Sequence, residues 1–317
     1  MAAKRVLLVG SLEHDTSVTA VRACLEGNHG AAVTVVDGKD FGLSSHASAR
    51  FGDSIRDLRI VTSDGELDLE ELHAIWLRRW HDPRVLEEVD SSRGTLEFAR
   101  ENWARFVSGL WLSSGVRCVN HPTRHWAAAN KLYQLRAAPE VGLRVPATLC
   151  TTDPTEAGRF IDEHHAGVVC KAIGSTFSAP ATKTVLVERR HLAALETVSV
   201  TPTLLQEFVP VHRDIRVIVI GTACFAGEIS TAEGADPIDW RADVDNPWRR
   251  HRLPAGVEQQ CVELTRALGL EYGAIDLRLT PDGDYVFFEI NPGGQFLFLE
   301  IWTGLPIVEA LADYLLQ

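Results

Sequence analysis

The sequence predicts an α/β protein with two or three domains, and three observations support this class. The chain has 317 residues, which is long enough for two or three domains with substantial cores. A strand at residues 5–10, a helical run at 17–26 and a second strand at 32–36 form a β-α-β opening, which predicts a small parallel sheet. Near the end of the chain, β-rich runs at 274–279 and 285–290 flank a short turn and predict an antiparallel hairpin.

Composition narrows the class of protein. Hydrophobic residues make up 45% of the chain and charged residues 23%, as in ordinary globular proteins. No run of about eighteen uncharged apolar residues is present, and the N-terminus leads directly into a strand, so we expect a cytoplasmic protein without a membrane span. The formal net charge of -12 argues against nucleic acid as a partner, because nonspecific binding to nucleic acid requires a basic surface.

The cysteine and histidine patterns show no familiar metal-binding motif. Six cysteines are scattered without a Cys-x-x-Cys pair, and most have apolar neighbours, so we expect buried free thiols. The twelve histidines show no His-Glu-x-x-His pattern. Oxygen ligands are therefore the better candidates for a metal site.

The first 120 residues continue the α/β pattern. After the β-α-β opening, the expected elements are a turn-rich stretch at 41–50, a hairpin at 57–69, a strand at 74–80, an amphipathic helix at 95–113 and a closing strand at 116–119. This region lacks Gly-x-Gly-x-x-Gly, so it does not carry a dinucleotide-binding fingerprint. The pair Arg78-Arg79 at the end of the strand at 74–80 fits a solvated strand end as well as a substrate contact.

Two lysines in the middle of the chain have informative surroundings. Lysine is rare here, with five lysines among 31 basic residues. Lys131 lies in a predicted helix at 124–140, and by itself it is typical of a helix surface. Lys171 lies in an apolar strand at 167–173, where a lysine needs a negative partner or a cavity. The further expected elements are a small-residue loop at 174–182, a strand at 204–210, a strand at 217–220 and a helix at 256–268.

The C-terminal hairpin predicts a magnesium site. Glu289 and Asn291 are two apart on the second strand, so they point to the same face, and Asp276 on the first strand can join them there. Two carboxylates and an amide oxygen are hard ligands that suit Mg²⁺ carrying substrate phosphates. The alternative is an ordinary hairpin with polar residues facing solvent. The neighbouring Phe287 and Phe288 argue against it, because acids in so apolar a strand need a partner.

These residues resemble the ATP-grasp superfamily, in which an Asp on one strand and a Glu-x-Asn on the next hold Mg²⁺ against the nucleotide. The segment that follows is more specific: Asn291-Pro-Gly-Gly-Gln-Phe296, then Thr303-Gly-Leu-Pro306 and an amphipathic helix at 307–316. It resembles the graspetide synthetases, the microviridin-type peptide macrocyclases. The resemblance extends in weaker form from about Asn120 to the C-terminus.

The resemblance implies an ATP-grasp fold in three parts. We expect a small parallel-sheet N-terminal domain at 1–120, a central lid domain at 121–203 and a C-terminal antiparallel-sheet domain at 204–317. ATP and Mg²⁺ are the implied cofactors, and the nucleotide is expected between the last two domains.

The resemblance also implies roles for individual residues. Arg216, Arg241 and Arg278 are expected to be catalytic, through stabilisation of phosphate charge. Mg²⁺ is expected on Asp276, Glu289 and Asn291. The nucleotide is expected on Lys131, Lys171, Gly174, Ser175, Gln206, Glu207, Phe208, Val209 and Asp214. A structural salt bridge is the alternative for the Asp214 and Arg216 pattern.

The implied reaction is carboxylate activation. A substrate carboxylate attacks ATP, which gives ADP and an acyl phosphate, and a hydroxyl or amine then displaces phosphate to form an ester or an amide. In graspetide synthetases both groups belong to one precursor peptide, whose leader segment docks on the enzyme. Two alternatives remain open: a RimK-like ligase that adds an amino acid to a protein or small acid, and a nucleotide-binding regulatory module without catalysis. The oligomeric state also remains open, a homodimer included.

Overall fold

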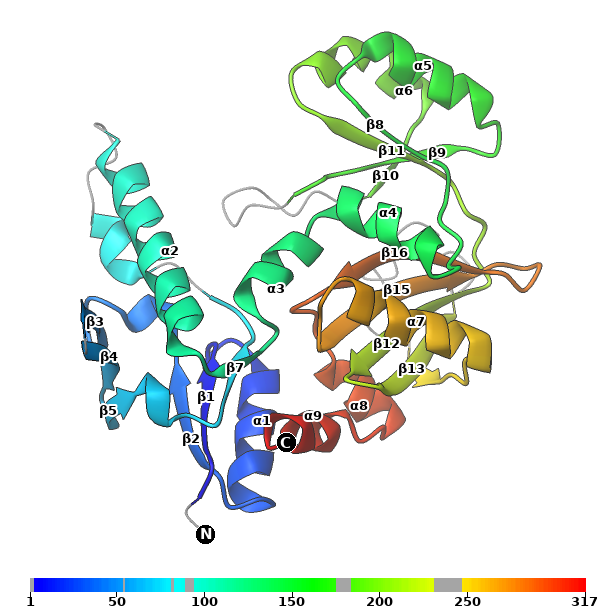
Figure 1. Cartoon of the computed structure of the whole chain (residues 1–317). Helices are drawn as coiled ribbons and strands as arrows, with labels where there is room; N and C mark the ends of the chain where they lie inside the picture. The colour runs from blue at the N-terminus through cyan, green and yellow to red at the C-terminus, as the bar shows by residue number, and fades with distance from the viewer. Residues whose placement is uncertain (1–2, 54, 81–82, 89–93, 175–183, 231–246) are drawn as a thin grey trace.

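A four-stranded parallel sheet with the order β2-β1-β6-β7 forms the first domain, as the β-α-β opening predicts. The computed structural model describes residues 3–53, 55–80, 83–88, 94–174, 184–230 and 247–317 (Figure 1). The elements of this domain are β1 (Arg5–Val9), α1 (Thr16–Gly27), β2 (Ala32–Val36), β6 (Ala74–Leu77), α2 (Thr95–Ser114) and β7 (Arg117–Val119).

A small antiparallel sheet is attached to this domain. It consists of β3 (His46–Gly52), β4 (Ile55–Thr62) and β5 (Gly65–Asp68). The predicted hairpin is confirmed as β4 and β5, whereas the stretch expected to be rich in turns ends in strand β3. Strand β4 has two edges that can form hydrogen bonds. One edge pairs with β5, and the other pairs with residues 46–52, which therefore form strand β3.

The helix expected at 124–140 is two helices, α3 (Pro122–Ala128) and α4 (Lys131–Glu140). Asn130 separates them, because its backbone is extended and its side-chain oxygen accepts hydrogen bonds from the backbone N–H groups of Leu132 and Tyr133 at 3.0 and 3.3 Å. It is the N-cap of α4. Lys131 is therefore the first residue of a helix rather than a residue in the middle of one.

The central domain has an antiparallel sheet of order β10-β9-β11-β8. Its elements are β8 (Thr148–Thr151), α5 (Pro154–Glu163), β9 (Val168–Lys171), β10 (Val185–Leu186), α6 (Arg189–Leu192) and β11 (Thr203–Glu207). Strand β11 pairs with β8 and β9, although the expected boundary at residue 204 assigns most of it to the next domain. We place the boundary after Glu207.

The C-terminal domain has an antiparallel sheet of order β14-β13-β12-β15-β16. Its elements are β12 (Arg213–Ile220), β13 (Ala223–Ser230), β14 (Arg249–Arg250), α7 (Ala255–Ala267), β15 (Tyr272–Leu279), β16 (Tyr285–Asn291), α8 (Leu297–Thr303) and α9 (Ile307–Leu315). Helix α7 packs on one face of the sheet through Cys261 and Leu264. The other face packs partly against α9, and the rest of it carries the polar residues described below.

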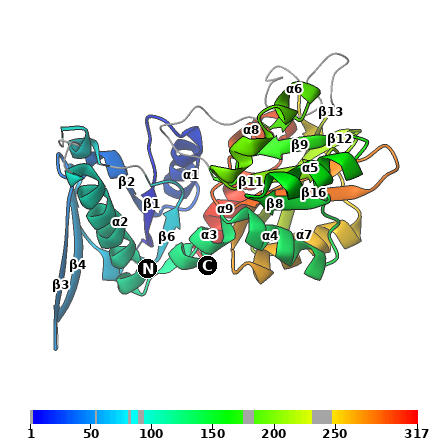
Figure 2. The ribbon, with the colours of Figure 1, turned by 90° about the horizontal axis from the view of Figure 1, so that it is seen from above.

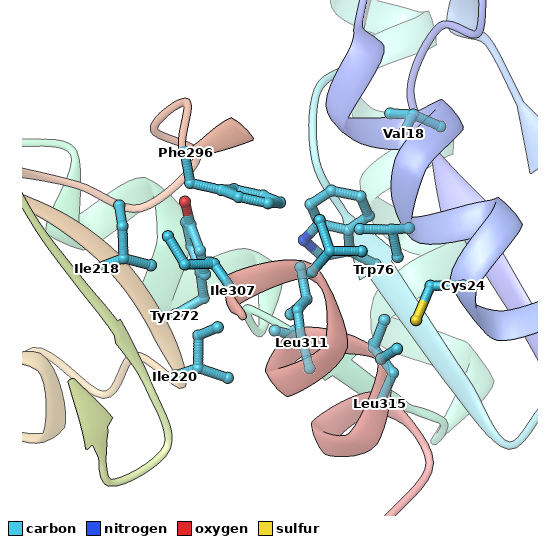
Figure 3. Packing of buried hydrophobic residues seen from close by; sticks show 14 of the residues in the cluster. Val18, Cys24, Trp76, Ile218, Ile220, Tyr272, Phe296, Ile307, Leu311 and Leu315 are labelled. Carbon is cyan, nitrogen blue, oxygen red and sulfur yellow. The ribbon is translucent and has the colours of Figure 1, made fainter. Parts of the chain in front are cut away.

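The N-terminal and C-terminal domains share one apolar core. Residues of α1, β6, the C-terminal sheet and α9 meet in it (Figure 3). Trp76 and Tyr272, from different domains, both pack against Phe296, with ring centroids 6.4 and 6.0 Å apart. Figure 2 shows the two domains side by side from above, with α9 between them. Across the described residues, every helix is too short or too polar to cross a membrane.

The shared core predicts that a substitution that creates a cavity in it will destabilise the protein. Leu311 of α9 is fully buried in it, so Leu311→Ala should lower the free energy of unfolding by about 2–5 kcal/mol. Chemical unfolding followed by tryptophan fluorescence measures this. The matched control is Ile301→Ala on α8, where the side chain is 73% exposed and a change below about 0.5 kcal/mol is expected. Equal effects of the two substitutions would contradict the assignment of α9 to a common core.

Candidate functional site

The hairpin of β15 and β16 places the predicted metal ligands on one face. Asp276 lies directly opposite Glu289, and Ala274 lies opposite Asn291. The register shifts between Asp276 and Leu277, which leaves Phe288 as an extra residue in a β-bulge. Because of the bulge, Phe288 faces the same side as Glu289, and its ring lies against two cations from other strands.

Charges of opposite sign alternate on the same face of β12 and β15. Arg216 Nη1 lies 2.8 Å from Asp276 Oδ1. Arg278 donates two hydrogen bonds to Asp214, at 2.8 Å from Nε and 3.1 Å from Nη2. All four side chains are at least about nine-tenths buried, so each charge needs its partner to offset desolvation. The salt-bridge alternative for Asp214 is thus present in the structure, with Arg278 rather than Arg216 as its partner.

Two lysines approach this face, Lys131 from the start of α4 and Lys171 from β9 of the central domain. Lys171 donates a 2.7 Å hydrogen bond to Gln206 Oε1, and its ammonium lies 4.4 Å from the centre of the Phe288 ring. Burial lowers the pKa of Lys171 to about 8, and Glu289 opposes that shift. Lys131 donates to the carbonyl of Ala172 at 3.1 Å and lies 3.4 Å from Glu289 Oε2. The structure therefore brings both predicted lysines next to the predicted metal ligands.

The segment at 206–209, which is part of the predicted nucleotide contact, connects the central sheet to the C-terminal sheet. Gln206 is buried and fixed from both ends, since it accepts from Lys171 and donates to Thr148 Oγ1 at 2.9 Å. Glu207 accepts a 3.0 Å bond from the Ala147 N–H. The carbonyl of Val209 accepts from Arg278 at 3.0 Å, and the backbone N–H of Phe208 donates to Gly167.

Gly174 is exposed at the end of the described part of its loop. Ser175 and Arg241 lie outside the described residues.

The Asn-Pro-Gly-Gly loop after β16 is held by contacts to its backbone. The Asn291 side-chain oxygen accepts from the Gly293 N–H at 3.0 Å, and the Tyr272 hydroxyl donates to the Gly294 carbonyl at 2.7 Å. A Cβ on Gly294 would lie 2.3 Å from the Cβ of Ala274, which is closer than real Cβ contacts come. Glycine is required there by packing, which is a reason for this residue that the sequence pattern alone does not supply.

Two amides that the sequence interpretation missed fix β15 and β16 in place. Asn120 donates to the carbonyls of Tyr272 and Pro292 at 2.8 and 2.9 Å and accepts from the N–H of Tyr272 at 2.8 Å. Gln134 of α4 exchanges two bonds with the backbone of Ile290, at 2.8 and 3.0 Å. Both amides are almost fully buried. Their partners lie about 150 positions away in the chain, so no local pattern indicates them.

Arg78 is not a solvated strand end. It is 3% exposed, its Nη2 lies 3.0 Å from the buried Asp15, and its Nη1 donates to the carbonyl of Gly293. Burial lowers the pKa of Arg78, and Asp15 opposes that shift. Burial and the charge of Arg78 also lower the pKa of the neighbouring His125 to about 4, so this imidazole is neutral at pH 7. Arg78 therefore connects the N-terminal domain to the loop next to the metal ligands.

The basic cluster at 248–252 has a structural role at three of its positions. Trp248 is buried and packs against Phe298, with ring centroids 5.4 Å apart. Arg250 donates to the carbonyls of Thr303 and Gly304, at the end of α8. His251 lies between Glu228 and Tyr285, at 2.6 and 2.8 Å.

The Asp214–Arg278 pair gives a direct test of the buried charges. Asp214→Asn removes the negative partner and leaves the Arg278 guanidinium buried, so the free energy of unfolding should fall by about 3–5 kcal/mol. Denaturant titration measures the change. Glu156→Gln breaks the exposed pair between Glu156 and Arg159 on α5, where less than about 1 kcal/mol is expected. An unchanged midpoint for Asp214→Asn would contradict the pairing.

The donor set fits magnesium and nucleotide phosphates. Asp276, Glu289 and Asn291 offer only oxygen atoms, which Mg²⁺ prefers. Arg216, Arg278, Lys131 and Lys171 provide four cations around the three carboxylates of Asp214, Asp276 and Glu289. The oxygen ligands would hold Mg²⁺, and the four cations would neutralise charge on phosphate oxygens.

Comparisons with known proteins agree with this chemistry. The model of the RimK-like ATP-grasp domain matches residues 128–315. Among solved structures, the macrocyclase MdnC of Microcystis aeruginosa, bound with precursor peptide MdnA, is 28% identical with a TM-score of 0.88, covering 98% of this chain and 99% of that chain. A Chryseobacterium gregarium RiPP-associated ATP-grasp ligase in complex with ADP and a leader and core peptide is 25% identical with a TM-score of 0.89, covering 98% and 96%.

A curated relative matches a smaller part of the chain. A probable alpha-L-glutamate ligase of Mannheimia succiniciproducens is 22% identical over 211 residues, which are 64% of this chain and 68% of the relative. The family model matches residues 128–315, whereas the structural similarity covers 98% of the chain and so also includes the N-terminal domain. The resemblance to the ATP-grasp superfamily and to its graspetide synthetases is thus confirmed. The chain belongs to the RimK-like ATP-grasp family and is an ATP-grasp ligase.

Proposed function

We propose that this ligase uses ATP to join Asp or Glu side chains of a precursor peptide to hydroxyl or amine side chains of the same peptide. The observation that carries the proposal is the opposition of Asp276 and Glu289 to Lys131 and Lys171 on one partly buried face. This arrangement supports phosphoryl transfer to a carboxylate. Similarity over 98% of the chain to a peptide-bound macrocyclase and to a peptide-bound ATP-grasp ligase supports a peptide as the substrate.

Side chains of this face and the segment at 206–209 would bind and orient the metal and the nucleotide. Asp276, Glu289 and Asn291 would hold Mg²⁺, which supplies charge neutralisation between phosphate oxygens when it is bound. Lys131 and Lys171 would contact the phosphates, and residues 206–209 would contact the adenine through backbone groups that meet between two sheets.

Two arginines are placed to stabilise charge that develops during the reaction. Arg216 and Arg278 are oriented by Asp276 and Asp214 before any substrate arrives. A pre-oriented guanidinium stabilises a developing negative charge without the cost of reorganisation. We assign these two arginines to the transferring phosphoryl group and the substrate carboxylate. Asp214 acts through Arg278, because Arg278 occupies both of its oxygens. Arg241, which lies outside the described residues, keeps its expected role as a third arginine.

A RimK-like addition of an amino acid to a protein or small acid is the second candidate. The match of residues 128–315 to the RimK-like domain and the similarity to a glutamate ligase favour it. The two candidates share the activation step and differ in the acceptor. The sign of the mass change of the acid-bearing substrate therefore separates them.

The proposal is tested with the full chain, ATP, Mg²⁺ and synthetic precursor peptides that carry a leader and an acidic core. Intact mass should fall by one water for each bond formed, with one ADP released per bond. A core in which every Ser, Thr and Lys is replaced by Ala is the control and should keep its mass. A gain in mass in the presence of free amino acids would support the RimK-like alternative. ADP release that does not depend on any substrate acid would contradict both candidates.

Substitution of a proposed metal ligand gives a sharper prediction. Glu289→Gln keeps the size of the side chain and removes its charge. Substrate-dependent ADP release should fall at least 100-fold, because a carboxylate that holds the metal contributes several kcal/mol to stabilisation of the transition state. Glu263→Gln on the exposed side of α7 is the matched control and should keep full activity. Circular dichroism should show both variants folded. Full turnover by Glu289→Gln would remove this residue from the metal site.

Substitution of Lys171 tests the nucleotide contact. Lys171→Met keeps the buried stem and removes the ammonium, so the Kd for ATP should rise about 10- to 100-fold, as expected for a lost charge-assisted hydrogen bond. Isothermal titration calorimetry measures the Kd. Arg159→Ala removes an exposed cation from α5 of the same domain and should leave the Kd unchanged. If the two variants bind ATP equally well, Lys171 has only a structural role.

A further inference from the structure

A second group of potential metal ligands lies outside the ATP-grasp site, where α1 of the N-terminal domain contacts α9. Cys24, His29 and Glu309 are the one group of three His, Cys, Asp or Glu residues in the described part of the chain whose ligand atoms all lie within 4.8 Å of one another. Cys24 lies on α1, His29 follows the end of that helix, and Glu309 lies on α9. Figure 3 shows Cys24 at the edge of the shared core, between these helices.

The ligand atoms face one another across the domain contact. Cys24 Sγ lies 3.0 Å from Glu309 Oε2, and His29 Nε2 lies 3.1 Å from Glu309 Oε1. Asp313 is one helical turn after Glu309, and its Oδ1 lies 3.8 Å from His29 Nε2. Three side chains that can bind a metal therefore converge from two domains, and Asp313 lies beside one of them, His29.

The local interactions leave one ligand atom unsatisfied. His29 Nε2 is buried and has no hydrogen-bond partner among the described residues, although carboxylate oxygens lie close to it. The thiol of Cys24 donates to Glu309. Burial, and then Glu309, raise the pKa of this thiol to about 12, so the thiol is protonated in the absence of a metal.

The dimensions and chemistry of the group fit zinc. Zinc bonds of about 2.0–2.3 Å place tetrahedral ligand atoms about 3.5 Å apart. The ligand atoms of Cys24, His29 and Glu309 all lie within 4.8 Å of one another, and Glu309 oxygens lie 3.0 Å from Cys24 Sγ and 3.1 Å from His29 Nε2. A thiolate with imidazole and carboxylate favours a borderline transition metal over Mg²⁺. Glu309 and Asp313 are 44% and 61% exposed, which leaves a path for the ion to enter.

We propose that Cys24, His29 and Glu309 bind one zinc ion that links the N-terminal domain to α9. The ion takes the place of the thiol proton, which leaves to solvent, and the thiolate sulfur bonds to the metal. The site is separate from the nucleotide site and does not depend on the proposed reaction. Its expected effect is on the contact between the two domains, which share a core at this position.

The test uses the full chain after treatment with a chelator and transfer into buffer with saturating Mg²⁺. Co²⁺ is titrated as the probe, because a thiolate–Co²⁺ bond gives a near-ultraviolet charge-transfer band that an all-oxygen site cannot give. The expected result is one Co²⁺ per chain, displaced by one equivalent of Zn²⁺, with a higher midpoint of thermal unfolding when Zn²⁺ is present.

Three variants make the test specific. Cys24→Ser should abolish the charge-transfer band and the effect of Zn²⁺ on the unfolding midpoint. Glu309→Gln, an exposed substitution that should not affect folding, should weaken Zn²⁺ binding at least tenfold. Cys150→Ser, which changes a partly exposed thiol in the central sheet, should bind as the unchanged protein does. A wild-type protein without the band, or a band that persists in Cys24→Ser, would overturn the proposal.

Discussion

The structure depends on the pairing of buried charges across β12 and β15. Arg216 with Asp276 and Arg278 with Asp214 are almost out of contact with water, so neither strand can place its charged residues on that face without the other strand. This constraint sets the register of the sheet and leaves Asp276 next to Glu289. It also orients two arginines before substrate arrives, which is the condition under which a charged side chain contributes most to catalysis. The same pairs thus support both the fold and the chemistry.

A second set of buried polar contacts ties the other parts of the chain to this face. Two buried amides lie in the segment between the N-terminal and central domains. Asn120 donates to the backbone of β15 and of the loop that follows β16, and Gln134 donates to the backbone of β16. Arg78 bonds to that same loop from the N-terminal domain. The loop beside Asn291 is therefore held from several sides, and a change in the position of the N-terminal domain must alter either these bonds or the loop. Through these bonds, the position of the N-terminal domain is coupled to the position of the predicted metal ligands.

Local patterns predicted the placement of the proposed ligand residues well and the contacts that support them poorly. Alternation along a strand placed Glu289 and Asn291 on one face, and a lysine in an apolar strand indicated that Lys171 has polar neighbours; the structure confirms both placements. The position of Phe288 was not predictable, because it depends on a β-bulge that strand alternation does not contain. Asn120 and Gln134 look like ordinary linker and helix residues, since their partners are distant in the chain. The helix break at Asn130 had a local signal, because Asn before a helical run is a typical N-cap.

The central claim is that this face activates a carboxylate by transferring phosphate to it. The most direct measurement uses a precursor peptide whose acidic side chains carry oxygen-18, incubated with enzyme, ATP and Mg²⁺, followed by mass analysis of the released phosphate. Formation of an acyl phosphate predicts that one labelled oxygen moves from the peptide to phosphate for each bond formed, because the carboxylate oxygen stays with phosphorus when the acceptor attacks the carbonyl. Bond formation with unlabelled phosphate and the label lost to water would contradict the account.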